Sequence, residues 1–143
     1  MKMLIPGVSV FDLRRIESDQ GAVLHALKSS EESFNGFGEA YFSTVKSGVI
    51  KGWKQHQRMA MNLVVPTGRI AFCCWARDET ESATIVVSAE NYVRLSIEAG
   101  VWMAFKGLDV RENILLNIAS IEHDPEEAIN KPLDYLPFVE AAT

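Results

Sequence analysis

The sequence lacks the features that mark membrane-spanning and secreted chains. Among its 143 residues, no run approaches the roughly 18 consecutive apolar residues that a membrane span requires. The opening segment, residues 1–7, is too short for a signal peptide. We therefore expect a protein of the cytoplasm with no membrane partner.

Cysteine is scarce, since the chain contains only two. Cys73 and Cys74 are adjacent, and adjacent side chains of a strand point to opposite faces, so a bridge between them would need unusual strain. Disulfide bonds are therefore not expected to stabilise the fold. We predict that both thiols are reduced and serve as packing residues.

Positive charge is in deficit, because 14 Lys and Arg residues face 19 Asp and Glu residues and give a formal net charge of −5. This balance argues against nucleic-acid binding, which uses basic side chains to meet phosphates. The segment Lys46–Arg58 is an exception, because it contains four basic residues and a histidine but no acid. Such a patch could bind one small anionic ligand, or it could be the solvated rim of a hairpin.

What is present indicates an ordinary globular chain, with 48% hydrophobic and 23% charged residues. The length suits one domain and is sufficient to bury a hydrophobic core. The sequence shows no long-period repeat and no low-complexity linker. We therefore expect a single domain over residues 1–143.

Short segments rich in aromatic and β-branched residues recur at intervals of about 8 to 12 residues, which predicts an all-β sandwich or barrel. The predicted strands are 8–13, 22–28, 39–45, 69–75, 83–88, 93–97, 101–105 and 113–119, with two more inside 48–68. Residues 22–28 also fit a helix, and a strand is preferred because it allows a hairpin around Gly21. Ser29–Ser33 could form one helical turn.

The end of the chain carries a helix-start signature. Within His123–Ile129, Asp124 suits the N-cap and Pro125 the first helical position, and two acids follow in the first turn. A short C-terminal helical tail is therefore predicted.

The stretch Gly48–Gly68 contains the densest set of reactive groups. Lys54, His56 and Met61 follow the spacing of the first cupin motif, in which two histidines and a glutamate hold a metal. Lys54 stands at the first histidine position and Met61 at the glutamate position, while Met103 takes the histidine position of the second motif. Protonated lysine has no lone pair, and thioethers bind soft metals. We therefore predict no catalytic metal.

Without a metal, Lys54 and His56 could still move protons. In a regular strand they point to the same side as Gly52, which leaves space beside them. Removing a proton next to a ketone needs a base near the carbon and a cation or donor near the oxygen. Histidine suits the base and lysine the cation. Crowding by Lys51 and Arg58 could instead make Lys54 the base.

Six further residues are candidates for substrate binding. Lys51 would help to hold phosphate, and Asn62 could either bind substrate or satisfy buried backbone groups, depending on the turn before it. Two aromatic candidates could be sugar-stacking platforms or residues of the core or rim. The full set is Lys51, Asn62, Glu39, Tyr41, Trp53 and Arg58.

The segments Gly48–Trp53 and Asn62–Ile70 resemble the dTDP-4-dehydrorhamnose 3,5-epimerase family of metal-free cupins. More particularly, the chain resembles a shorter group of epimerase-related proteins of polysaccharide biosynthesis, which Phe37–Ser43, Gly100–Phe105 and Ile121–Glu127 also fit. The resemblance implies a cupin-type jelly-roll homodimer that binds a nucleotide-linked 4-keto-6-deoxy sugar. It also implies that carbons next to the keto group are inverted through an enolate, without a metal or organic cofactor.

The chain departs from this family at catalytic positions. The family's arginine falls at Lys51, so a cation is kept at that position. Its catalytic histidine falls at Lys54, so the histidine base is not kept there. Its catalytic-site lysine falls at Asn62 and its later histidine at Met103. Residues Asn117–Ile121 contain no counterpart of its tyrosine acid.

Two functions follow. The first is a sugar-nucleotide epimerase or isomerase acting on a dTDP- or UDP-linked 4-keto-6-deoxy hexose in cell-surface polysaccharide biosynthesis, with Lys54 and His56 as the catalytic pair. The second is a catalytically inactive protein that keeps the fold and binds a sugar nucleotide or a partner.

Overall fold

The protein is described by a computed structural model that covers residues 1–142. Within them lie thirteen β-strands. These are β1 (Lys2–Ile5), β2 (Val8–Asp12), β3 (Arg15–Ser18), β4 (Gly21–Leu24), β5 (Glu39–Thr44), β6 (Ile50–His56), β7 (Met61–Thr67), β8 (Arg69–Trp75), β9 (Ser82–Ser88), β10 (Val93–Ile97), β11 (Trp102–Gly107), β12 (Ile114–Ala119) and β13 (Ala128–Asn130).

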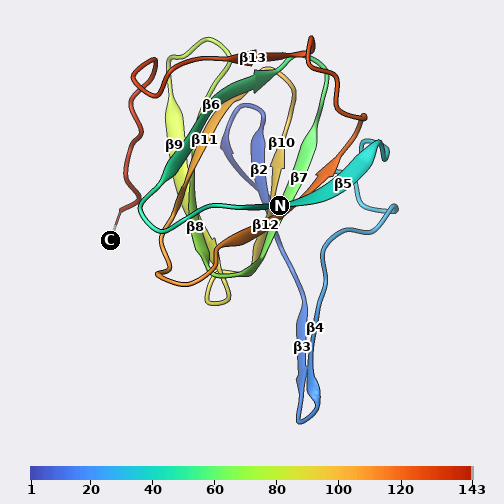
Figure 1. Cartoon of the computed structure of the whole chain (residues 1–143). Helices are drawn as coiled ribbons and strands as arrows, with labels where there is room; N and C mark the ends of the chain where they lie inside the picture. The colour runs from blue at the N-terminus through green and yellow to red at the C-terminus, as the bar shows by residue number, and fades with distance from the viewer. Residues whose placement is uncertain (143) are drawn as a thin grey trace.

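Two antiparallel sheets form the body of the molecule (Figure 1). The first has the strand order β1-β2-β10-β7-β12-β5 and the second β13-β6-β11-β8-β9, and the two are not joined into a closed barrel. Alternate residues of strands from both sheets, such as Leu63 of β7 and Phe72 of β8, meet in one buried core. The predicted all-β class is therefore confirmed.

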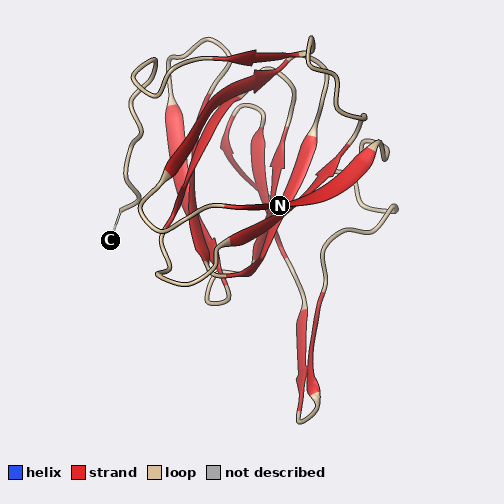
Figure 2. Cartoon of the chain, in the orientation of Figure 1, coloured by secondary structure: helices blue, strands red, loops and turns tan. Residues whose placement is uncertain are grey.

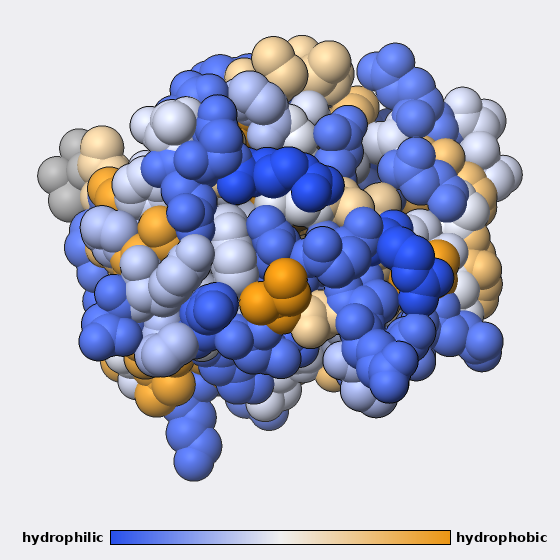
Figure 3. All heavy atoms as spheres, turned by 90° about the horizontal axis from the view of Figure 1, so that it is seen from above, coloured by the Kyte–Doolittle hydropathy of each residue, from blue (hydrophilic) through white to orange (hydrophobic). Residues whose placement is uncertain are grey.

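The hairpin predicted around Gly21 is confirmed as β3 and β4, which pair with each other and project from the body (Figure 1). Its apolar side chains Ile16 and Val23 are 42% and 59% exposed. On the side where β13 lies, the surface is mostly hydrophilic, with apolar residues in small separate groups (Figure 3). The described residues contain no helix long and apolar enough to cross a membrane.

The predicted C-terminal helical tail is wrong, because no residue of 1–142 is helical (Figure 2). Asp124 does begin a turn, since its Oδ1 accepts the backbone N–H of Glu126 at 3.0 Å and its carbonyl accepts that of Glu127 at 3.1 Å. The next three residues, Ala128–Asn130, pair with the edge of β6 as β13. Tertiary pairing therefore overrides a local helix-start signal. Ser29–Ser33 likewise lies in turns.

Strand β6 carries a β-bulge opposite β11. Lys54 pairs with Met103 and Lys51 with Phe105, so Gly52 and Trp53 together lie opposite Ala104. The extra residue turns Lys51 and Lys54 to the same face, whereas residues three apart in a regular strand face opposite ways. Glycine is needed at position 52, because a Cβ there would lie 2.4 Å from the Cβ of Ala104.

On the outer face of the first sheet, the side chain of Arg94 is fully buried and holds the loop that precedes β5. Its guanidinium donates to the Ala26 carbonyl at 2.8 Å, to the side chains of Glu31 and Ser33 at 2.7 Å, and to Oδ1 of Asn62 at 3.0 Å. The fork of arginine donors suits this divergent set of acceptors. Arg94 thus fixes residues 26–33 against the sheet.

We expect Arg94→Leu to lower the free energy of unfolding by about 3 kcal/mol, because Glu31, Ser33 and Asn62 lose their common partner. Urea denaturation measures this change. The matched control is Arg77→Leu, because Arg77 is exposed and its side chain donates, within residues 1–142, only to the Ala99 carbonyl at 3.4 Å. Equal stability of the Arg94 variant and the wild type would contradict the anchoring role.

Candidate active site

A cavity of about 400 Å³ lies between the two sheets, bounded by β5 and β6. The four positions that would hold the metal in the two cupin motifs, called here the cupin frame, all open onto it. They are Lys54, His56, Met61 and Met103. The complete lining is Tyr41, Ser43, Lys51, Gly52, Lys54, His56, Met61, Leu63, Met103, Phe105, Leu115, Asn117, His123 and Asn130. This lining contains two lysines and two histidines but no carboxylate, so the cavity favours an anionic ligand.

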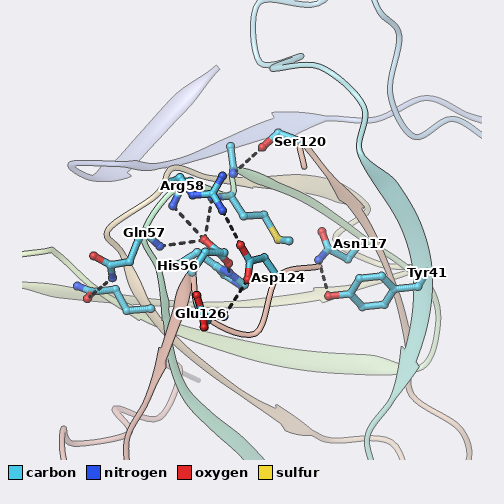
Figure 4. A network of polar contacts seen from close by, with 12 residues as sticks. Tyr41, His56, Gln57, Arg58, Asn117, Ser120, Asp124 and Glu126 are labelled. Carbon is cyan, nitrogen blue, oxygen red and sulfur yellow. Dashed lines mark hydrogen bonds and ion pairs between the residues drawn. The ribbon is translucent and has the colours of Figure 1, made fainter. Parts of the chain in front are cut away.

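His56, the last residue of β6 and labelled in Figure 4, is held from behind by Glu127. Its Nδ1 is hydrogen-bonded to Oε1 of Glu127, and the two side chains are only 10% and 2% exposed. Oε2 of Glu127 accepts the backbone N–H groups of Gln57, Arg58 and Met59 at 3.1, 3.0 and 3.2 Å. Because Nδ1 is engaged, Nε2 is the ring nitrogen left for the cavity.

The state of Glu127 decides the tautomer of His56. Burial alone would raise the pKa of Glu127, but the hydrogen bonds from His56 and from the backbone of Arg58 and Met59 outweigh it and lower the pKa to about 2. The carboxylate is therefore ionised at neutral pH. It draws the imidazole proton to Nδ1 and leaves a lone pair on Nε2, which is the arrangement of a general base.

The lysines place two ammonium groups on the same wall. Nζ of Lys51 donates to the Thr44 carbonyl at 2.7 Å, which holds this cation beside the end of β5. Lys54 is solvent-exposed, and its side chain has no hydrogen-bond partner within the described residues. One ammonium is therefore fixed by the protein, and the other is free to meet a ligand.

Tyr41 and Asn117 form a polar pair away from the His56 group (Figure 4). They are cross-strand neighbours on β5 and β12, and Nδ2 of Asn117 donates to the Tyr41 hydroxyl at 2.9 Å. The hydroxyl oxygen thus acts as acceptor for Asn117, which leaves its own proton available for the cavity. Oδ1 of Asn117 is buried and has no partner within residues 1–142.

The structure brings four of the predicted site residues to this cavity: Lys51, Lys54, His56 and Tyr41. The placement of His56 beside Lys54 agrees with the regular alternation expected for that end of the strand. Lys51 joins them through the bulge.

Asn62 and Trp53 do not reach the cavity. Asn62 alternates with the cavity-lining Met61 and Leu63, so it faces outward, where its Nδ2 donates to the Ser33 carbonyl at 3.0 Å and its Oδ1 accepts from Arg94. Trp53 is 1% exposed and packs on the outer side of the second sheet. Both side chains thus lie behind the sheets that enclose the cavity.

Arg58 and Glu39 also lie outside the lining. The guanidinium of Arg58 pairs with Asp124 at 2.9 Å, and its side chain is 60% exposed. Glu39 begins β5, and its Oε1 is buried without a partner among residues 1–142.

The sequence alone indicates no site role for Glu127, Asn117, Asn130 or His123. Glu127 was part of the predicted helix, where two adjacent acids gave no sign of which one is buried. His123 and Asn130 reach the cavity only because the chain turns at Asp124 and pairs with β6. Within residues 1–142, no three or more His, Cys, Asp and Glu side chains gather into a metal-binding group.

Comparison with known structures reveals a close relative. A dTDP sugar isomerase from Desulfovibrio desulfuricans shares 30% sequence identity, with a TM-score of 0.88 and coverage of 93% of this chain and 90% of that one. This chain belongs to the dTDP-sugar isomerase family. The resemblance inferred from the sequence is confirmed.

Two more distant solved structures share the fold. A variant of QdtA, a 3,4-ketoisomerase from Thermoanaerobacterium thermosaccharolyticum in complex with TDP-4-keto-6-deoxyglucose, is 19% identical, with a TM-score of 0.77 and 88% of each chain covered. ChmJ, a 3'-monoepimerase from Streptomyces bikiniensis in complex with dTDP-quinovose, is 16% identical, with a TM-score of 0.82 and coverage of 98% of this chain and 83% of that one.

Among curated proteins, the spore coat polysaccharide biosynthesis protein SpsL of Bacillus subtilis is 21% identical over 137 residues, which cover 92% of this chain and 91% of SpsL. A scan against protein-family models finds no match.

The lowered pKa of Glu127 predicts a pH-dependent contribution to stability. Its pKa falls from an ordinary 4.5 to about 2, so the ionised form stabilises the folded protein above pH 4.5, and this contribution is lost as the pH falls through 2. We expect Glu127→Gln to lower the free energy of unfolding by up to about 3 kcal/mol near neutral pH, and this difference to shrink in acid.

Urea denaturation at several pH values above and below 4.5 measures the difference. Glu126→Gln is the matched control, because Glu126 is the exposed neighbour. A difference between wild type and Glu127→Gln that stays constant across this range would contradict the assigned ionisation.

Proposed function

We propose that this protein is an isomerase or epimerase of a dTDP- or UDP-linked 4-keto-6-deoxy hexose. One observation carries the proposal: a single cavity combines His56, fixed by Glu127, with the ammonium groups of Lys51 and Lys54. Membership of the dTDP-sugar isomerase family supports the substrate class, as does the sugar nucleotide bound to the QdtA variant.

His56 acts as the base in this proposal. Nε2 takes the proton from the carbon next to the keto group, and the electrons of the broken C–H bond form an enolate. The imidazolium that results is stabilised by the ionised carboxylate of Glu127. No electrons are gained or lost overall, because the electron pair of the C–H bond stays on the sugar and forms a new C–H bond when a proton is delivered.

The lysines stabilise negative charge. Lys54, which has no protein partner within residues 1–142, places its ammonium at the enolate oxygen, where charge develops. Lys51, held by the Thr44 carbonyl, meets the diphosphate of the nucleotide. The absence of a carboxylate from the lining supports this assignment.

The return of the proton decides the product. Delivery by the Tyr41 hydroxyl to the other face of the same carbon inverts that centre and gives an epimer. Delivery by His56 to the former carbonyl carbon, while the hydroxyl proton on the first carbon passes to the enolate oxygen, moves the keto group and gives an isomer. Both routes use groups that line this cavity.

The apolar part of the wall suits a deoxy sugar. Five apolar side chains from three strands line it, and they can contact a methyl group without leaving a hydroxyl unpaired. They are Met61, Leu63, Met103, Phe105 and Leu115.

The fuller assignment is a cupin-type jelly roll that works as a homodimer in the cytoplasm, in polysaccharide biosynthesis. The likeness to SpsL supports the pathway class. The projecting β3–β4 hairpin and Phe42 of β5, which is 68% exposed, supply apolar surface that a second copy would cover. Light scattering of the purified protein tests the dimer.

Solvent-deuterium exchange tests the reaction. In D₂O, the wild type should incorporate deuterium next to the keto group of dTDP-4-keto-6-deoxyglucose or a related dTDP- or UDP-sugar, as followed by NMR. We expect His56→Asn to slow exchange by about 10²- to 10⁴-fold, because the base is lost. His25→Asn is the control, since His25 does not line the cavity.

Exchange at the wild-type rate in His56→Asn would contradict the assigned base. If no sugar nucleotide exchanges but dTDP raises the melting temperature, the protein binds without catalysis. If no nucleotide binds at all, the proposed function fails.

A further inference from the structure

Residues 131–140, called here the C-terminal segment, cross the outer face of the second sheet, behind the candidate site. Apolar residues of the segment pack on Trp53, Cys73, Trp102 and Ala104 as a second buried cluster. Two tryptophans anchor it: Nε1 of Trp75 donates to the Pro137 carbonyl at 2.9 Å, and Nε1 of Trp53 donates to two further carbonyls. The segment is therefore attached at two places: to Trp53 of β6, next to Lys54, and to Trp75 of β8.

Trp53 is the attachment point on β6. Its indole N–H is shared between the carbonyls of Leu133 and Leu136, each at 3.1 Å. Its backbone N–H donates to the Lys131 carbonyl at 3.1 Å, and its own carbonyl accepts the Lys131 N–H at 3.0 Å. The ring of Phe138 lies 6.5 Å from its ring. Trp53 thus joins the C-terminal segment by both its backbone and its side chain.

The direction of Trp53 is linked to the direction of the catalytic candidates. Beyond Lys51, a β6 without its bulge would alternate regularly, and Trp53 would then point into the cavity while Lys54 and His56 pointed out. The bulge reverses this arrangement by placing Trp53 outward. Burial of Trp53 beneath the C-terminal segment therefore favours the one register that directs both residues inward.

We propose that the C-terminal segment, acting through Trp53, is a positioning element that fixes the bulged register of β6 and so keeps Lys54 and His56 directed into the cavity. The residues just before the segment include Glu127, which orients His56, and β13, which pairs with Lys54. Together with the segment, they hold β6 from its edge and from its outer face. The proposal rests on the proposed function only where a nucleotide is used as the probe.

A ligand-free measurement tests the register directly. The ε-methyl NMR signals of Met61 and Met103 report on the cavity, because both residues line it. Leu136→Ala removes packing from the C-terminal segment, and Trp53→Phe removes only the indole donor. Trp75→Phe is the matched control, because it removes the same kind of anchor on β8, away from the bulge.

We expect the two methionine signals to shift in Leu136→Ala and Trp53→Phe and to stay in place in Trp75→Phe. Circular dichroism confirms that each variant is folded, and Trp53→Phe is the mildest change if Leu136→Ala does not fold. Unchanged methyl signals in folded Trp53→Phe protein, with its melting temperature lowered as in Trp75→Phe, would overturn the proposal, because the segment would then be a simple cover.

A titration with dTDP-4-keto-6-deoxyglucose extends the test, because Lys54 is assigned to the oxygen of its keto group. We expect this sugar nucleotide to bind about tenfold more weakly to Leu136→Ala, as for loss of one charge-assisted hydrogen bond. In a Lys54→Met background the same change should cause no further loss, because the segment acts through the direction of Lys54. Additive losses would contradict the positioning role. Failure of the wild type to bind this sugar nucleotide would count against the proposed function and leave the methyl result to decide this proposal.

Discussion

The pairing of two residues of β6 against one residue of β11 is the constraint on which the candidate site depends. Side chains of a strand alternate, so one extra residue exchanges the inner and outer sets beyond it. Here the exchange places Lys51 and Lys54 on one face and sends Trp53 to the other. The close approach of Ala104 requires glycine at position 52. Without the bulge, regular alternation would place Lys51 and Lys54 on opposite faces of β6; with it, both face the cavity.

Charge placement explains how an acidic protein can hold a basic cavity. The lining contains only cationic and neutral groups, while the carboxylate of Glu127 sits behind His56. Burying that carboxylate is tolerated because four N–H donors, one from His56 and three from the backbone, satisfy its oxygens. The net charge of −5 therefore describes the whole chain and not its cavity.

The sequence by itself determined the all-β class and most of the strands, because turn residues and apolar segments are local signals. Strands β8 and β10 occupy the predicted residues 69–75 and 93–97. It also determined that His56, Lys54, Met61 and Met103 would share one cavity, since the spacing of the cupin frame fixes which strand positions converge. Within this frame, local spacing was sufficient.

Only the tertiary structure decided the partners of these residues. Ala128–Asn130 became a strand because the edge of β6 was available, and this pairing brought Glu127 to His56. Asn62 turned outward because its neighbours Met61 and Leu63 face the cavity, and Arg94 supplied a partner there. These outcomes depend on contacts between residues 32 and 71 positions apart, which local propensity does not encode.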